Sequence, residues 1–200
     1  MHPAKAFHVE DEAELLAHLA RYPFVTLAAS PQGKLTLAQA PVVVRRRDGR
    51  VVLDFHLSRG NALAPHMATG FTAVMISQGP DAYVSPDWYG VEDQVPTWNY
   101  ASVEAHGAVG PMSDAGLVAL LDDLSAQEEA RLAPKPPWTR HKMTDGRFEA
   151  MTRMIVGGSL IVERLEGTFK LSQNKSEQAR AGVIDALGDH PIARLITGLR

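Results

Sequence analysis

Apolar and polar residues alternate with a period of two along much of the first half of the chain, which is the pattern of β-strands with one buried face. Short clusters of turn-forming residues separate these segments. The pair Asp48-Gly49 predicts a tight hairpin, because both central residues of a type I′ turn need positive φ. Gly79-Pro80 predicts a tight corner. The expected strands are 24–29, 35–44, 51–57, 71–77, 81–85 and 97–109.

Other segments repeat their apolar residues every three or four positions, as amphipathic helices do. The clearest covers 113–130, where Ser113 stands at the N-cap position and leucines form the apolar stripe. A long strand is expected over 155–171, and such strands usually bend or bulge at glycines like Gly157-Gly158 and Gly167. Shorter helices are expected over 10–21, 61–69, 148–154 and from 176 onward.

Closely spaced hairpins with inserted and appended helices predict a small antiparallel barrel, since closing a sheet removes its exposed edges. The expected fold class is therefore mainly β with α, an α+β fold. A chain of 200 residues with 45 % apolar content can build one such core, so we expect a single domain over 1–200. Its expected parts are a barrel core (about 22–112 and 155–171), a helical insertion (about 113–154) and a helical tail (about 176–200).

The composition excludes several kinds of site. The chain has no cysteine, so disulfides, a thiolate nucleophile and iron–sulfur or zinc-finger ligation are excluded. The net charge of −3 at pH 7 gives no overall attraction to phosphate backbones. No apolar run is long enough to span a membrane and the start lacks a signal-peptide pattern, so we expect a cytoplasmic protein without membrane contact.

A first candidate for chemistry lies at 56–61, where a strand gives way to an expected short helix. Ser58, Arg59 and the free backbone N–H groups of a helix start are the parts that hold a phosphate. The alternative is a polar strand end that caps the next helix.

A second candidate is the segment 83–100, which contains two of the three tryptophans and three of the four tyrosines. Large aromatic side chains with polar edges favour a binding surface for a planar molecule or a subunit interface. An ordinary core strand is the alternative, and Trp98 and Asn99 alternate faces, so they can serve different purposes. A third candidate is the polar run 169–175, which can also be a solvated loop with a helix cap.

The run Arg45-Arg46-Arg47 raises the question of nucleic acid. Three charges at a hairpin tip are more typical of a solvated turn, and Asp48 and Asp54 lie close by in the sequence. No helix-turn-helix pattern with a basic recognition helix is present. DNA binding therefore has no recognisable reading element in this chain.

Five motifs, in order along nearly the whole chain, resemble those of the PaiB family of FMN-binding proteins. Members of that family are often described as negative transcriptional regulators of protease synthesis and sporulation. The motifs are His56-Leu57-x-x-Gly60-Asn61, Gln78-Gly79-Pro80-x-Ala82-Tyr83-x-Ser85-x-x-Trp88-Tyr89, Val95-Pro96-Thr97-Trp98-Asn99-Tyr100, Ile155-Val156-Gly157 and Lys170-Leu171-Ser172-Gln173-Asn174.

The resemblance implies a split β-barrel of the flavin-reductase and pyridoxamine-phosphate-oxidase type, a homodimer with FMN sites built across its interface. Residues at the strand-to-helix junction would hold the flavin phosphate, and backbone groups around 39–42 would face the isoalloxazine ring. Trp98 and Asn99, or the segment 170–174, would close the site from the partner subunit. This chain has Gln39-Ala40 where the family typically carries Thr-His. The residues so assigned to the cofactor are Gln39, Pro41, Val42, His56, Ser58, Arg59, Asn61, Gln78, Trp98, Asn99, Lys170, Ser172, Gln173 and Asn174.

More than one function stays open at this point. One is a regulator whose state follows flavin occupancy or redox level, and another is an oxidoreductase using NAD(P)H, in which the flavin carries the hydride or electron chemistry. A third is a barrel that has lost its ligand and works as an interaction protein. Related split barrels also bind haem, and His56, His66 or His106 could then ligate the iron.

Overall fold

The structure is a computed structural model that describes residues 2–199. Met1 and Arg200, the two ends of the expected domain, lie outside the described residues. The described residues form two compact units. The barrel unit consists of residues 19–77 and 105–165, and the terminal unit consists of residues 2–18, 78–104 and 166–199.

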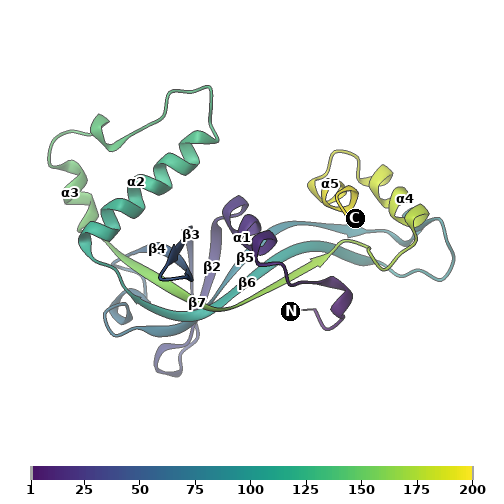
Figure 1. The fold of residues 1–200 in the computed structure, drawn as a ribbon, viewed down its shortest axis with the longest axis horizontal. Coiled ribbons are helices and arrows are strands. Elements are labelled where there is room, and N and C mark those ends of the chain that lie inside the picture. Colours follow the sequence, from purple (N-terminus) through teal and green to yellow (C-terminus); the bar gives the residue numbers. More distant parts are fainter. Residues whose placement is uncertain (1, 200) are drawn as a thin grey trace. The chain divides into compact units, whose positions relative to one another are not determined.

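Six strands build a closed antiparallel barrel, so the predicted α+β barrel fold is confirmed (Figure 1). The strand order is β7-β4-β3-β2-β5-β6, and the additional pairing of β6 with β7 closes the ring. The long strands β5, β6 and β7 contribute residues to both units. The six strands are β2 (Phe24–Ala29), β3 (Thr36–Arg47), β4 (Arg50–Ser58), β5 (Phe71–Val84), β6 (Thr97–Pro111) and β7 (Ile155–Lys170).

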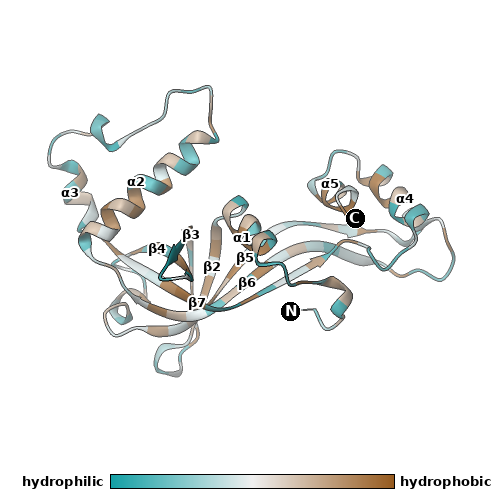
Figure 2. Ribbon diagram, in the orientation of Figure 1, coloured by the Kyte–Doolittle hydropathy of each residue, from teal (hydrophilic) through white to brown (hydrophobic). Residues whose placement is uncertain are grey.

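Alternate residues of the strands fill the interior of the barrel unit, as the pleat of a sheet requires. Leu27, Leu53 and Phe55 are fully buried there, as are Val42 and Met75. Burying one such side chain contributes about 1.5–3 kcal/mol. Hydrophobic residues accordingly follow the barrel strands, whereas the tip of the β3–β4 hairpin is hydrophilic (Figure 2).

The predicted type I′ hairpin is confirmed. Asp48 and Gly49 have φ values of 50° and 77°, and Arg47 pairs with Arg50 across the turn. Positive φ at both central residues matches the right-handed twist of the flanking strands, which explains the Asp-Gly signal.

The helical insertion begins with α2 (Asp114–Ala130), which packs on the outer face of the barrel. Its predicted cap is confirmed, since the Oγ of Ser113 accepts a hydrogen bond from the N–H of Gly116 at 3.1 Å. Leucines on one stripe of α2 form a buried cluster with a strand residue of β3. The cluster is Val43, Leu117, Leu120 and Leu124. The insertion continues through η5 (Arg140–Lys142) and α3 (Arg147–Thr152).

In the terminal unit the short strand β1 (His8–Val9) pairs with the end of β7. Two helices follow β7 in the chain. A Cβ atom on Gly182 would lie 2.2 Å from the carbonyl oxygen of Trp88, so helix α4 (Glu177–Leu187) rests directly on the backbone of η4 (Pro86–Tyr89). No helix within residues 2–199 is long and apolar enough to cross a membrane. The remaining elements are η1 (Lys5–Phe7), α1 (Glu12–Arg21), η2 (Pro31–Gly33), η3 (Ala64–His66) and α5 (Pro191–Thr197).

The corner predicted between residues 71–77 and 81–85 was wrong, since β5 runs through Gly79-Pro80 as one strand. The long strand predicted over 155–171 is confirmed as β7, but the break expected at its glycines is not found, since β7 pairs with β4 without interruption through Gly157 and Gly158. A Cβ on Gly158 would lie 2.1 Å from the Cε of Met67, so this glycine makes room for core side chains and does not end the strand.

The helix expected over 61–69 was also wrong, because only the single turn η3 forms there. Pro65 lacks the N–H that would bond to the carbonyl of Asn61 in an α-helix. The side chain of Asn61 instead accepts from the N–H of Leu63 at 2.9 Å, which makes a local turn.

Candidate functional site

The terminal unit contains a cavity of about 230 Å³ at the junction of the aromatic segment and the end of β7. The predicted cofactor residues Asn99, Lys170, Ser172 and Asn174 all line it. Positions far apart in the sequence meet here because β6 supplies Asn99 and the chain after β7 supplies Ser172 and Asn174. The other residues of the wall are His2, Phe7, Tyr89, Val95, Thr97 and Lys175.

A buried hydrogen-bond cluster supports the floor of this cavity. The amide of Asn99 donates to the Oγ of Ser172 at 2.9 Å, and the hydroxyl of Tyr89 lies 3.3 Å from the same oxygen. Asn99 is 0 % exposed and Ser172 is 3 % exposed. Ser172 also has a φ of 60°, a left-handed conformation that is uncommon outside glycine, asparagine and aspartate. Such a conformation persists only where the surroundings hold it in place, as these bonds do.

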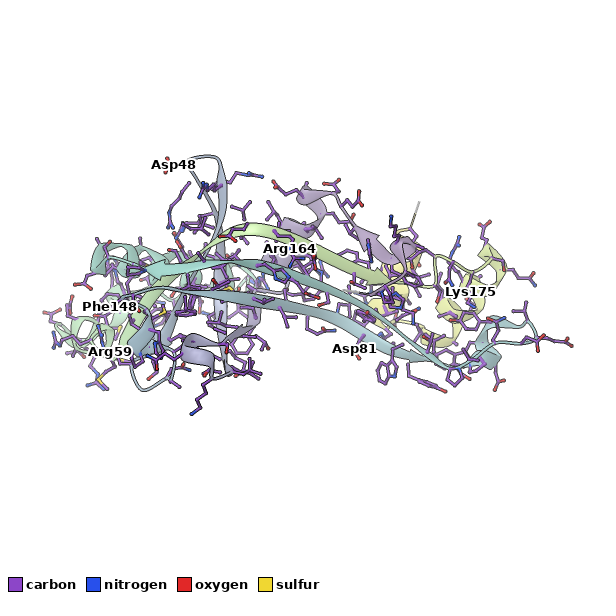
Figure 3. The ribbon with its side chains drawn as sticks, turned by 90° about the horizontal axis from the view of Figure 1, so that it is seen from below. Asp48, Arg59, Asp81, Phe148, Arg164 and Lys175 are labelled. Atoms are coloured by element: carbon purple, nitrogen blue, oxygen red, sulfur yellow. The ribbon has the colours of Figure 1, made fainter. Side chains whose placement is uncertain are left out.

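Two lysines give the cavity a positive charge. The Nζ of Lys170 donates to the Oγ1 of Thr97 at 2.5 Å. The Nζ of Lys175 donates to the Oε1 of Gln94 at 2.6 Å and lies 5.1 Å from the ring centre of Tyr89 (Figure 3). Neither lysine has a carboxylate partner within the described residues, so both ammonium groups are suited to an anion.

The other predicted residues of the terminal unit do not line this cavity. Trp98 is 54 % exposed and meets Tyr83 edge to face at 6.2 Å. Gln173 uses its side chain to close the turn after β7, accepting from the N–H of Leu171 and donating to the carbonyl of Phe169. Gln78 is exposed on β5.

In the barrel unit the segment 58–61 is a compact turn. The N–H of Gly60 bonds to the Oγ of Ser58, and the N–H of Asn61 bonds to the carbonyl of Ser58. The N–H of Arg59 donates to the carbonyl of Met154. The expectation of free backbone N–H groups for a phosphate was therefore wrong, because each of these donors already has a partner.

The side chain of Arg59 still fits an anion. Its Nε donates to the carbonyl of Arg153 at 2.8 Å, which fixes the direction of the guanidinium group while the residue remains exposed (Figure 3). The two Nη groups present a fork that matches the oxygens of a phosphate. A phosphate at this end of β4 would therefore be held by side chains.

The residues predicted to face the flavin ring have different environments. Gln39 is exposed and pairs with Thr26, whereas Val42 is 1 % exposed inside the barrel. The N–H of Val42 donates to the carbonyl of Pro23 at 2.9 Å. This backbone donor was expected to face the isoalloxazine ring, but it is already used within the fold. Pro41 is half-buried at the point where β3 changes partner from β2 to β4.

The histidines considered for iron occupy separate places. His56 lines a cavity of about 340 Å³ under the helical insertion, and burial lowers the pKa of its imidazole. His66 is half-buried in the turn η3. The Nδ1 of His106 lies 3.1 Å from a guanidinium nitrogen of Arg164.

The arginines of the hairpin serve a structural purpose that the sequence analysis missed. Arg45 and Arg47 both donate to the carboxylate of Asp54, which is 1 % exposed, and Ser159 donates to it at 2.6 Å. Burial alone would raise the pKa of Asp54, but the hydrogen bonds from Arg47, Ser159 and Arg45 outweigh it and hold that pKa below its ordinary value. The period-two spacing of 45 and 47 was the available signal.

A family model described as "Putative FMN-binding domain" matches residues 1–164. The chain belongs to this family of FMN-binding domains. The match covers the barrel strands up to the middle of β7, and the motif Lys170–Asn174 lies beyond it.

Relatives outside the family model extend the comparison. The chain is 28 % identical over 187 residues to the Protease synthase and sporulation protein PAI 2 of Bacillus subtilis, covering 94 % of this chain and 89 % of that protein. The predicted resemblance to the PaiB family is thereby confirmed. An uncharacterised protein of Aspergillus fumigatus is 31 % identical over 121 residues, covering 52 % of this chain and 46 % of that protein.

Solved structures share the fold of the FMN-binding domain at low sequence identity. A FAD and heme binding protein from Mycobacterium smegmatis has a TM-score of 0.54 and 18 % identity, covering 82 % of this chain and 73 % of the other. The flavocytochrome Anf3 from Azotobacter vinelandii has a TM-score of 0.57 and 13 % identity, covering 90 % of this chain and 78 % of the other.

Proposed function

We propose that this protein binds a flavin, and specifically FMN, as a homodimer. The observation that carries the proposal is the match of the chain to the FMN-binding family, together with cationic groups of the kind that recognise a flavin phosphate. Arg59 is the proposed phosphate ligand, since its guanidinium group is exposed and fixed in direction. Ser58 and Asn61 beside it, and Gln39 and Pro41 on β3, are the proposed neighbours of the cofactor.

We propose that the cavity of the terminal unit forms part of the flavin site of the partner subunit. Its volume of about 230 Å³ is below the range of roughly 300–1,000 Å³ typical of complete small-molecule sites. It therefore suits one part of a flavin. Lys170 and Lys175 would attract the negative charge of the cofactor, and the buried pair Asn99 and Ser172 would hold the floor of the cavity beneath it.

An exposed apolar sheet face supports the proposed homodimer. On the outer side of β3, β2 and β5, Phe24 is 65 % exposed and Leu37 is 56 % exposed. Leu37 and Val74 both pair with Ala28, one from each side, and Ile76 pairs with Thr26. Exposed apolar side chains gathered on one face in this way are typical of an interaction site. Sedimentation tests it: Leu37→Glu should yield monomers, whereas Leu132→Glu, at another exposed apolar position, should remain dimeric.

The direct test of the cofactor is an absorption spectrum of the purified protein before and after addition of FMN. Any chromophore released by denaturation is then identified by chromatography. Flavin bands that shift on binding support the proposal. A Soret band would move the assignment to haem, and the lack of both a chromophore and FMN uptake would overturn it.

We further propose that the protein acts as a transcriptional regulator that responds to flavin, with an NAD(P)H-dependent oxidoreductase as the second candidate. The ion pairs of Arg45 and Arg47 with Asp54 favour the oxidoreductase, because these two arginines already neutralise a buried carboxylate and are less available to bind DNA. Salt-sensitive and sequence-selective retention of DNA would support the regulator. Steady oxidation of NAD(P)H by flavin-loaded protein would support the enzyme.

A further inference from the structure

A second cavity lies in the barrel unit, where the helical insertion covers the ends of β4 and β7. Its volume is about 340 Å³. Large apolar side chains from five different segments form most of its wall. They are Leu121 of α2, Trp138 of the linker, Met143 after η5, Phe148 and Met151 of α3, and Ile155 of β7. Flat rings and flexible thioethers are side chains that accommodate planar organic molecules.

His56 is a principal polar group on this wall. The Nδ1 atom of its ring is inaccessible to solvent and has no hydrogen-bond partner within the described residues. A molecule in the cavity cannot reach this buried atom, and a buried N–H without a partner is rarer than a buried acceptor without one, so we place the proton on Nε2 and take Nε2 as the nitrogen left for a ligand. Burial lowers the pKa of His56, which favours the neutral imidazole.

The charges at the cavity compensate each other. Arg140 is paired with Asp122, whose Oδ1 lies 3.1 Å from its Nε, and the guanidinium group also lies 4.9 Å above the ring of Phe148. Both charged residues line the cavity. Because the ion pair already neutralises itself, the wall gives no net attraction to an ionic ligand, and a neutral molecule suits it best.

We propose that this cavity binds a neutral planar aromatic molecule that carries a hydroxyl or carbonyl group, whose oxygen accepts a hydrogen bond from the Nε2 of His56. An apolar cavity of about 150 Å³ holds one benzene ring, so the present one has room for two fused rings. The proposal goes beyond flavin binding: Ser58, Arg59 and Asn61, the proposed phosphate neighbours, are not part of this wall. His56 is thereby assigned to the second ligand.

The test compares two probes that differ by one hydroxyl group, 2-naphthol and naphthalene, on flavin-free protein. Affinities are followed by quenching of tryptophan fluorescence, since Trp138 lies in the wall. Wild-type protein should bind 2-naphthol about three- to tenfold more tightly, the factor expected from one hydrogen bond. In His56→Phe this preference should vanish while the affinity for naphthalene is kept. Equal binding of both probes by wild-type protein would overturn the proposal.

A second pair of variants locates the probe without changing His56. Ser125→Phe places a ring into the cavity and should reduce 2-naphthol binding at least tenfold, whereas Ala119→Phe, on the exposed side of the same helix, should leave it unchanged. Retained binding in Ser125→Phe would show that the probe lies elsewhere, for example on the Phe24–Leu37 face, and would contradict the proposal. Titration with FMN distinguishes the two sites, since Ser125→Phe should bind FMN normally even if Arg59→Ala does not.

Discussion

Asn99 donates a hydrogen bond to the Oγ of Ser172 at 2.9 Å, although 73 positions separate the two residues in the chain. This contact joins β6 to the turn after β7 within the terminal unit. It also fixes Ser172 in its left-handed conformation, with φ at 60°. The wall of the lysine-lined cavity therefore depends on one buried hydroxyl group.

We expect Ser172→Ala to lower the free energy of unfolding by about 1–3 kcal/mol. The substitution removes the oxygen that accepts from Asn99, and an amide left unpaired in a buried place costs its full desolvation. Chemical denaturation measures the change. Ser30→Ala is the matched control, because Ser30 is exposed and its side chain caps nothing, and it should alter stability by less than about 0.5 kcal/mol. Equal stability of the two variants would contradict this role of Ser172.

The carboxylate of Asp54 should make stability depend on pH. Its pKa in the folded protein lies below the ordinary value of 3.8, so the stabilisation is complete above that value and is lost as the pH falls through the folded pKa. Asp54→Ala should cost about 3 kcal/mol at pH 7, at the lower end for a broken buried pair because Arg45 and Arg47 can reach water. Urea denaturation from pH 7 downward should show a weaker acid dependence in the variant than in wild type. Asp81→Ala, at an exposed position, is the control.

Gly107 should tolerate no side chain. A Cβ at this position would lie 2.0 Å from the carbonyl oxygen and 2.9 Å from the carbonyl carbon of Ile161, both backbone atoms of the facing strand. Gly107→Ala must therefore push β6 and β7 apart where the barrel closes, which we expect to cost at least about 1–3 kcal/mol. Gly110→Ala on the same strand meets nothing within 4 Å and should be neutral or slightly stabilising in thermal denaturation. Similar melting temperatures for both variants would contradict this account of barrel closure.

Local signals in the sequence predicted most elements of the fold. The Asp48-Gly49 hairpin and the Ser113 cap follow from the conformations of a few adjacent residues, and both form as expected. The failures concern long-range packing. Gly158 was interpreted as a point where the strand bends, but its lack of a side chain serves Met67, which approaches from a distant part of the chain. No local pattern contains that information.

The candidate site shows the same division. The polar run 169–175 and the aromatic segment 83–100 were both identified, but their meeting in one cavity, with His2 and Phe7 in the same wall, depends on how separate segments pack. Arg45 and Arg47 were interpreted as a solvated turn because their partner Asp54 lies on the opposite strand of the hairpin. The two-residue turn sets the register that brings these residues to one face, but the burial of Asp54 and its bond with Ser159 depend on β7, which pairs with β4 from far along the chain.

Arg59→Ala should weaken FMN binding by about 2 kcal/mol, because it removes a charge-assisted contact to the phosphate. Titration of flavin-free protein with FMN, followed by flavin fluorescence, measures the loss. Riboflavin, which lacks the phosphate, should bind wild type and variant equally. Arg164→Ala, another exposed arginine of the barrel unit, serves as the control. An unchanged affinity for FMN in Arg59→Ala would remove Arg59 from the cofactor site.

Trp98→Ala should impair both dimer formation and FMN binding while leaving the subunit folded. Trp98 is 54 % exposed and meets Tyr83 edge to face, an aromatic pair worth about 0.5–1.5 kcal/mol beyond area burial, so much of its ring is uncovered within one chain. A tryptophan exposed in this way gains most when a second surface covers it. Sedimentation and FMN titration of Trp98→Ala should therefore show a larger effect than those of Tyr83→Ala, which removes the same ring contact but keeps the tryptophan. A dimeric Trp98→Ala variant with normal FMN affinity would show that Trp98 serves only to pack against Tyr83.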